Sequence, residues 1–418
     1  MNPEWSPHPR YRLYTQPASY WPALRNLSPF SDDAEGAVGA LEREICLRFG
    51  VNAAVCVPMA RTGIYLALDA MIQPGQTVIM SPLTIIDVVN MVILAGGIPP
   101  FADICRQSCS LDPGQVESLI DGRTGAVLIT HLHGESAGAH AFREICRAKK
   151  VPLIEDTAQA FGALENGCRL GTIGDLGVYS FGFYKNVNAW QGGMLVSNDT
   201  ELIARIRRTT TGWKALSASR LFSLNLRGLL TDVATWPPIF AALTHKVLRF
   251  SQLRGISMVN RKLDPEDGAS KLQVMPDEYL SAMTCSQATM VLNQLNRVDT
   301  DTDSRLARAA RYHESLAGLD GLVTPHWPGN KEHIFTYYPI QLPRRDALLR
   351  FALTHGRDFA AQHLRNCADL PEFEEYHRDC PAARMASRDL VLLPTYPRYP
   401  MREVERNIEV IEAFLKSR

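Results

Sequence analysis

The sequence has no excess of charge of either sign. Its 44 Lys and Arg residues balance 44 Asp and Glu residues, and the charges are spread along the chain. Proteins that bind nucleic acid usually carry a basic patch or stripe, so this balance disfavours nucleic acid as a partner. The first ten residues, MNPEWSPHPR, also lack the apolar run of a signal peptide. We therefore expect a cytoplasmic protein.

Nine cysteines are present, but no two of them form a CxxC pair. Such pairs are typical of zinc sites and redox motifs, so reduced thiols in a cytoplasmic enzyme are expected. Cys105 and Cys109 lie four residues apart, which leaves open a metal or redox pair. Two unrelated thiols flanking a turn is the favoured interpretation, and no metal site is predicted.

Apolar strands and helices alternate from residue 53 to residue 150. Strands are expected at 53–59, 77–82, 98–104 and 126–134, and helices at 62–72, 86–97, 113–122 and 140–150. Nearly continuous apolar strands separated by helices predict a mostly parallel sheet that is covered on both faces. Such α/β sheets bind ligands at the carboxyl ends of their strands.

Two side chains of complementary chemistry follow the next apolar strands. Asp156 comes directly after the buried run 151–154, and Lys185 follows the strand at 176–181. A lysine in a partly dry pocket can lose its proton and form a Schiff base with an aldehyde. A carboxylate that faces a pyridine nitrogen keeps that nitrogen protonated. This pair is how proteins hold pyridoxal phosphate (PLP).

Three motifs around these residues resemble those of the DegT–StrS family of PLP-dependent sugar aminotransferases. They are EDTAQAFGA, SFGFYKN and GGMLVSND, in family order and spacing, with Gln191 replacing the usual Glu. The resemblance implies the PLP-dependent transferase type I fold, with a large domain and a smaller C-terminal α/β domain. The expected parts are an N-terminal arm (1–33), the large PLP-binding domain (34–212), an apolar and basic helical insertion (213–275) and the small domain (276–418).

The resemblance also assigns roles within the central motifs. Asp156 pairs with the pyridine nitrogen, and Lys185 forms the Schiff base and then moves the substrate proton. Gln159 is expected near the phenolic oxygen of the ring, and Ser180 at the phosphate. Asn186 is expected to order the lysine loop.

The first strand-to-helix turn, residues 59–63, is the expected phosphate site. Thr62 can cap a helix whose free N–H groups favour a phosphate, with Gly63 in the same turn. Arg61 stands where the family has Thr and can bind phosphate directly, although a surface arginine beside a capped helix is the alternative. Ile85 occupies the place of a ring-stacking aromatic and is expected to contact the ring by dispersion.

Candidates for substrate contact lie on other segments. His131 and His133 end the fourth strand, and strand alternation places both on one face. They lack a third ligand at a useful spacing, so a metal site is disfavoured. His131 can instead be a buried residue near the cofactor. The other candidates are Tyr184, His333, Tyr337 and Tyr338, with strand packing as the alternative for the last three.

The insertion 213–275 departs from the family pattern. It is longer and more apolar than expected, and its apolar residues are spaced by Arg and Lys. The uncharged run 233–245 contains Pro237 and Pro238 and is too short to span a bilayer. Two interpretations stay open. The insertion covers the active site or a partner subunit, or 215–262 lies as a basic amphipathic segment on the inner, anionic face of a membrane.

The resemblance implies an aminotransferase in polysaccharide or natural-product biosynthesis. It would move an amino group from an amino acid, most often glutamate, to a keto group on a nucleotide-linked sugar. Because Arg61, Ile85, Leu280 and the insertion depart from the pattern, a related ketone is also open. The rivals are a sugar dehydratase, in which family members often replace the lysine with His, and a PLP-binding regulator without turnover. A homodimer is expected, since family sites are built at a subunit interface.

Overall fold

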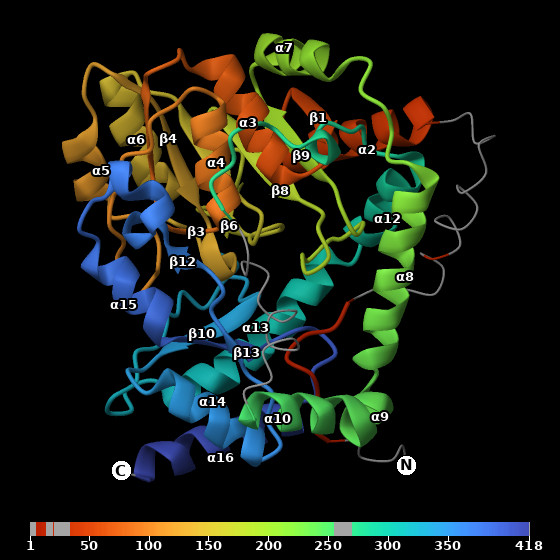
Figure 1. Cartoon of the computed structure of the whole chain (residues 1–418), viewed down its shortest axis with the longest axis vertical. Coiled ribbons are helices and arrows are strands. Elements are labelled where there is room, and N and C mark those ends of the chain that lie inside the picture. Colours follow the sequence, from red (N-terminus) through yellow and green to blue (C-terminus); the bar gives the residue numbers. More distant parts are fainter. Residues whose placement is uncertain (1–5, 14–19, 21–33, 255–269, 418) are drawn as a thin grey trace.

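The computed structural model describes residues 6–13, 20, 34–254 and 270–417. Six strands form the main sheet (Figure 1). In spatial order they are β1 (Ala53–Val57), β9 (Gly193–Ser197), β8 (Leu176–Ser180), β5 (Leu153–Asp156), β4 (Thr124–Thr130) and β2 (Thr77–Met80). β8, β5, β4 and β2 pair in parallel, while β9 is antiparallel to both its neighbours. The predicted mostly parallel sheet is confirmed.

Helices cover both faces of this sheet. They are α2 (Ala34–Phe49), α3 (Ala60–Met71), α4 (Ile86–Leu94), α5 (Pro113–Leu119), α6 (Ala139–Lys149) and α7 (Thr200–Thr210). Successive side chains of a strand point to opposite faces. Along β4, Leu128 accordingly belongs to the core shared with α3 and α4, whereas Val127 and Ile129 belong to the core shared with α5 and α6. The α/β fold class is thus as predicted.

The predicted strand at 98–104 does not form a ladder. Only two parallel bridges join it to β2, from Ile98 to Thr77 and from Phe101 to Met80. Pro99 and Pro100 lie between the bridges and have no N–H group to donate. The segment therefore follows the edge of the sheet without continuing it.

A second sheet lies towards the C-terminus, with strand order β10 (Tyr337–Gln341), β13 (Leu390–Pro394) and β11 (Ala360–Ala361). Its helices are α13 (Val298–Leu316), α14 (Arg345–Thr354), α15 (Pro381–Asp389) and α16 (Met401–Lys416), and α12 (Cys285–Leu295) precedes them. Four short strands form two further pairs, β6 (Leu164–Glu165) with β7 (Cys168–Arg169) and β3 (Leu83–Thr84) with β12 (Arg365–Asn366). The β3–β12 pair joins the two halves of the chain. The exact domain limits stay a prediction.

The insertion is helical where the structure describes it. It contains α8 (Ala218–Ala234), α9 (Pro237–Ile239), a π-helical turn (Phe240–Thr244) and α10 (His245–Leu253). In Figure 1, α8 stands along one edge of the molecule, and α9 and α10 run across one end of it. Residues 255–269 of the insertion lie outside the described residues. None of the described helices is both long enough and apolar enough to cross a membrane.

Residues 6–13 of the N-terminal arm pack against the C-terminal elements. Arg10 binds Asp358 through its backbone N–H at 2.9 Å and through its guanidinium, whose Nε lies 2.8 Å from the carboxylate. Nearby, Arg357 forms a buried ion pair with Glu403 of α16, and Arg357 also donates to the Ser6 hydroxyl at 2.7 Å. Charged pairs thus fix the arm to the body of the protein.

Glu403 should make stability depend on pH. Burial alone would raise the pKa of its carboxyl, but His8 and Arg357 together lower it to about 2. A depressed carboxyl pKa stabilises the fold above the unfolded value, and this stabilisation is lost as pH falls from about 4.5 to about 2. We expect Glu403→Gln to lower the free energy of unfolding by roughly 3 kcal/mol at pH 7, with a much smaller effect near pH 3.

Denaturant unfolding at a series of pH values measures this difference. Glu405→Gln is the matched control, because Glu405 is half exposed in its ion pair with Arg311. An equal loss for Glu403→Gln and Glu405→Gln, or a loss that does not change with pH, would contradict the expectation.

Candidate active site

Asp156 ends strand β5 and is buried. Its Oδ1 atom accepts the backbone N–H of Ala158 at 2.9 Å. Burial raises the pKa of the Asp156 carboxyl, while the Ala158 N–H, Lys185 and His131 act to lower it. A buried carboxylate is costly unless a positive charge lies beside it, so Asp156 is prepared to bind a cationic group.

Lys185 lies on the loop after β8, the strand next to β5. Burial lowers the pKa of the Lys185 ammonium; the charge of Asp156 acts to raise it, and the charge of Arg61 lowers it further. Asp156 and Lys185 thus follow two paired parallel strands at the same edge of the sheet, and the charge of each acts on the pKa of the other. The structure thus brings together the predicted amine and carboxylate.

The other residues of the central motifs support this loop. Asn186 donates its side-chain amide to the Phe161 backbone carbonyl at 3.5 Å, and the side-chain Oε1 of Gln159 accepts the backbone N–H of His133 at 3.0 Å. Ser180 ends β8, where its hydroxyl accepts the Gly182 N–H at 3.4 Å. Their contacts with the cofactor stay proposals.

The predicted cap of the phosphate-site helix is wrong. Helix α3 begins at Ala60, and Met59 is its N-cap residue, without a side-chain hydrogen bond. Thr62 lies inside the first turn and donates its hydroxyl to the Tyr279 carbonyl at 3.1 Å. Its hydroxyl is thus used to hold another segment. The site retains the N–H groups at the start of α3. Gly63 packs against the sheet, where an added Cβ would lie 2.9 Å from Leu195, so its role is to let α3 approach the strands closely.

Arg61 lies in the same first turn. Its guanidinium is paired with the Asp87 carboxylate and donates to the Tyr279 hydroxyl at 3.1 Å. That hydroxyl donates in turn to Asp87 at 3.1 Å. Arg61 is therefore held in place beside Lys185 and is not a free surface arginine. Ile85 is the N-cap residue of α4 and packs half-buried against the main core.

The expected contact of His131 with substrate is not supported. His131 is fully buried, and its Nδ1 atom accepts the Ala137 N–H at 3.0 Å. The proton must then be on Nε2, which donates to Glu155 at 3.1 Å. Glu155 also accepts the N–H groups of Gly171, Ile173 and Gly174 at 2.6–2.8 Å. His131 is thus a structural residue behind the cofactor site.

The two histidines do not share a face of one strand. β4 ends at Thr130, and His133 lies in a 3₁₀ turn with a left-handed backbone at φ 57°. His133 is buried against Gln362, whose side-chain nitrogen lies 2.7 Å from its Nε2, and burial, aided by His363, lowers its pKa to about 3. The prediction that His131 and His133 share one face was wrong, because the strand ends and the chain turns before His133.

His333 and Tyr338 serve packing. His333 is buried, stacks on Phe335 with ring centroids 3.5 Å apart, and accepts the Phe335 N–H at 3.0 Å. Burial holds the pKa of His333 well below its usual value. Tyr338 is buried and lies 3.0 Å from His313 Nδ1. The structure therefore does not bring His333 to an accessible surface.

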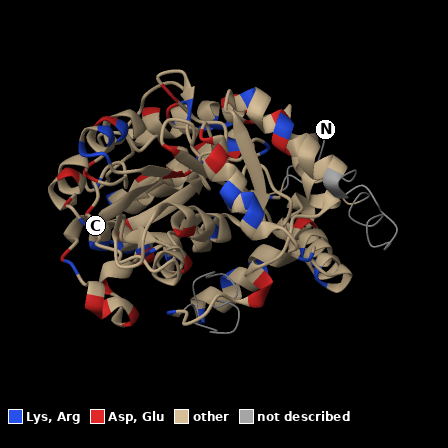
Figure 2. Cartoon of the chain, turned by 90° about the horizontal axis from the view of Figure 1, so that it is seen from above, with Lys and Arg blue, Asp and Glu red and all other residues tan. Residues whose placement is uncertain are grey.

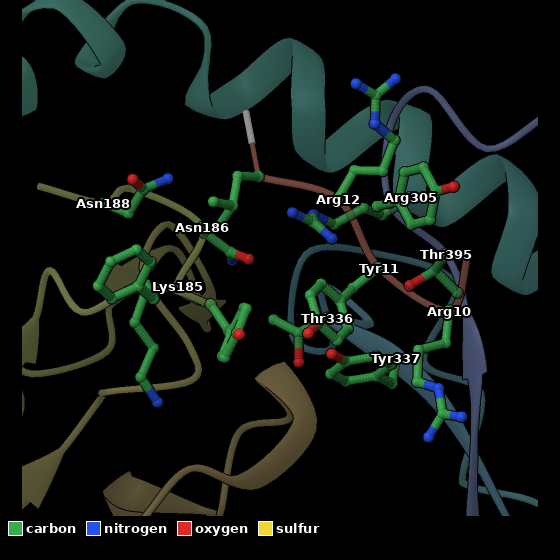
Figure 3. Close-up of a pocket in the computed structure, with 14 residues that line it drawn as sticks. Arg10, Tyr11, Arg12, Lys185, Asn186, Asn188, Arg305, Thr336, Tyr337 and Thr395 are labelled. Carbon is green, nitrogen blue, oxygen red and sulfur yellow. The ribbon is translucent and has the colours of Figure 1, made fainter. Parts of the chain in front are cut away.

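A cavity beside the lysine loop is lined by Tyr184 and Tyr337. Figure 3 shows this cavity with Tyr337 and Lys185 labelled. Its walls come from the arm (10–13), the lysine loop (183–188) and segments near the second sheet. The charged residues among those that line it are all basic: Arg10, Arg12, Lys185 and Arg305. An anionic ligand would match this lining. The three arginines were not predicted as site residues, although the Arg10-Tyr11-Arg12 run in the arm is a local signal for a basic lining.

The residues fit pyridoxal phosphate. Asp156 would hold the ring nitrogen, Lys185 the aldehyde carbon, and Arg61 with the start of α3 the phosphate. The bound cofactor would supply an electron sink for a substrate carbanion. Among the described residues, no group of three His, Cys, Asp or Glu side chains is placed to hold a metal ion. This fold and this site define a PLP-dependent transferase of fold type I.

The chain belongs to the DegT/DnrJ/EryC1/StrS aminotransferase family, whose model matches residues 35–226 and 272–413. It is 27% identical over 391 residues to the spore coat polysaccharide biosynthesis protein SpsC of Bacillus subtilis, covering 91% of this chain and 90% of that protein. It is 27% identical over 378 residues to GDP-perosamine synthase of Caulobacter vibrioides, covering 88% and 86%. The fold resembles the sugar aminotransferase CalS13 of Micromonospora echinospora, with a TM-score of 0.73 and 20% identity over 97% of this chain and 99% of that one. The chain is thus a PLP-dependent aminotransferase.

Replacing Lys185 by Ala should abolish the absorbance band of the cofactor Schiff base. Transamination should fall by roughly two to four orders of magnitude, because the group that moves the substrate proton is lost. Absorbance titration of the purified apoprotein with PLP measures the first effect. Lys331→Ala is the control, because Lys331 pairs with Asp299 on the surface. A band that persists in Lys185→Ala would show that a different lysine binds the cofactor.

Replacing Arg61 by Gln should weaken PLP binding about tenfold, because a charged donor near the phosphate is lost. It should also raise the pKa of Lys185, since Arg61 lowers it. The neutral amine would then form at higher pH, and the pH profile of PLP uptake should move to the alkaline side. Arg61→Lys, which keeps the charge, should preserve most of the profile. Unchanged affinity and an unchanged profile in Arg61→Gln would rule out this role.

Proposed function

We propose that the enzyme transfers an amino group from an amino acid, with glutamate as the expected donor, to a keto group on a nucleotide-linked sugar or a related ketone. The observation that carries this proposal is the position of Asp156 at the end of β5 and of Lys185 on the loop that follows the paired strand β8. Burial lowers the pKa of the Lys185 ammonium, which makes it easier for the amine to accept and return the substrate proton.

The basic cavity supports an anionic substrate. Its lining contains four basic residues and neither Asp nor Glu, and one of the four, Arg10, is paired with Asp358 outside the lining. A nucleotide-linked sugar carries phosphates, and glutamate carries two carboxylates, so both partners of the proposed reaction match its charge. Two relatives, SpsC and GDP-perosamine synthase, support the same class, since their names refer to a spore coat polysaccharide and to perosamine synthesis, whereas a third relative, also 27% identical, is named a pleiotropic regulatory protein.

The dehydratase and regulator alternatives are less well supported. Transamination needs an amine that can move a proton, and Lys185 is retained in a setting that lowers its pKa. A regulator without turnover would not need a lysine with a lowered pKa, because a bound cofactor can stabilise a protein without any proton transfer. These alternatives make different predictions for what an amino donor does to the bound cofactor.

The proposal includes assembly and location. We propose a homodimer, as the family resemblance implies, and a place at the inner face of a membrane through residues within 215–262. The location is supported by the apolar and basic character of α8 and α10. Neither feature is needed for the chemistry at Lys185.

Glutamate should convert the bound cofactor to its amino form in a single turnover, with loss of the Schiff-base band. A panel of amino acids tested by stopped-flow absorbance should identify the donor, and nucleotide-linked keto sugars should then restore the band. Asp156→Asn should slow the donor step by roughly two orders of magnitude or more, because the ring nitrogen loses its carboxylate. If no donor changes the cofactor band, the result would favour a regulator. If the sugar loses a hydroxyl group and no amine forms, the result would favour a dehydratase.

A further inference from the structure

Exposed apolar side chains are concentrated in the insertion. Fifteen large hydrophobic residues are exposed in the described part of the chain, and ten of them lie between Phe222 and Leu253. Each of the ten is 41–61% exposed. They are Phe222, Leu226, Leu229, Leu230, Val233, Trp236, Leu243, Val247, Phe250 and Leu253, and we call them the insertion surface. Single exposed apolar residues need no explanation, but such a concentration marks an interaction site.

The insertion surface follows helical periodicity. On α8, its first members lie at positions i, i+4, i+7, i+8 and i+11 from Phe222, which places them along one side of the helix. From Leu243 through α10, the spacing is i, i+4, i+7 and i+10. These are stripes that an interfacial helix would turn toward an apolar layer.

The opposite side of α8 packs against the body of the protein. Leu221 and Leu224 are buried there, and Gly228 lies so close to Trp190 that an added Cβ would come within 2.8 Å of its ring. The Trp190 indole N–H donates to Asn225 at 2.9 Å. Because α8 is fixed to the body by this side, its second apolar side faces away from the protein.

The charge of the segment has one sign. Residues 215–254 contain five Lys or Arg and one Asp, a net charge of +4, whereas the whole chain has a net charge of 0. The single acid, Asp232, accepts a hydrogen bond from the Tyr20 hydroxyl at 2.6 Å. Lys246 and Arg249 are exposed between the apolar residues of α10, and the exposed Arg254 follows directly after that helix. Elsewhere the two signs of charge are interspersed (Figure 2).

Eight of the ten residues of the insertion surface, all except Phe222 and Leu226, lie outside the residues that match the family model. The family model matches residues 35–226 and resumes at 272, so the second half of α8 and all of α9 and α10 fall outside it. The elements that hold Asp156 and Lys185 lie inside the matched residues. We therefore expect this segment to serve a function that is specific to this chain and is not shared by the family.

We propose that the insertion surface binds an anionic lipid bilayer, with its apolar stripes at the level of the headgroups and its basic residues against the lipid phosphates. A bilayer offers negative charge and an apolar layer together, which matches both features. A second copy of the chain is the less suitable partner, because a two-fold contact would bring this +4 segment against its equal. The inference refines the proposed location and does not depend on the acceptor.

Sedimentation of the full-length holoenzyme with lipid vesicles tests this inference. The vesicles contain phosphatidylcholine alone or phosphatidylcholine with phosphatidylglycerol. The protein should sediment with the anionic vesicles and not with the neutral ones, and added salt should release it. Leu230→Ser/Leu243→Ser/Phe250→Ser and, separately, Lys246→Gln/Arg249→Gln should each weaken the binding about tenfold or more.

Leu47→Ser/Met401→Ser is the matched control, because both residues are exposed apolar residues outside the insertion. This control should bind vesicles as the unaltered protein does. Thermal unfolding and transamination in solution should be unchanged in all three variants, which separates a failure of this inference from a failure of the proposed function. Analytical ultracentrifugation without lipid completes the test. The inference would be overturned if the protein does not bind vesicles or if all variants bind equally. It would also be overturned if the leucine and phenylalanine changes dissociate a dimer.

Discussion

The structure depends on the placement of one carboxylate and one amine at the ends of adjacent parallel strands. Burial disfavours the charged form of both Asp156 and Lys185, and the opposite charge of each partner offsets part of this cost. The order of β5 and β8 in the sheet produces this proximity, although the two residues are far apart in the chain. A cofactor with a cationic ring nitrogen and an aldehyde satisfies both groups at once.

The position of Asp156 is fixed by its neighbour in the chain. Because successive strand residues face opposite sides, Glu155 points away from Asp156 and into the core. There it accepts three backbone N–H groups and the Nε2–H of His131. These bonds hold the end of β5 against β4 and against the turn that follows Leu170. The precision of the site therefore comes from a buried polar network behind it.

Local patterns in the sequence were sufficient for the sheet, its covering helices and the Asp156–Lys185 pair, since apolar periodicity and motif spacing are local properties. These local patterns gave wrong predictions where a contact between residues far apart in the chain determines the position of a side chain. The Thr62 hydroxyl bonds to the carbonyl of Tyr279, which no local rule could identify as its partner. His133 left the expected face because β4 ends before it. The arginines of the cavity were missed because the position of the arm depends on Asp358, far along the chain.

Helix α8 connects the lysine loop of the active site with the insertion surface. Its inner side contacts the lysine loop, where Arg227 lies 4.8 Å from the centroid of the Phe183 ring and Asn225 binds Trp190. Its outer side carries half of the insertion surface. Trp190 has a left-handed backbone at φ 67°, which a residue other than glycine adopts only when its surroundings hold it there. The insertion is thus part of the support of the lysine loop, and a surface that orders α8 also constrains the loop that presents Lys185.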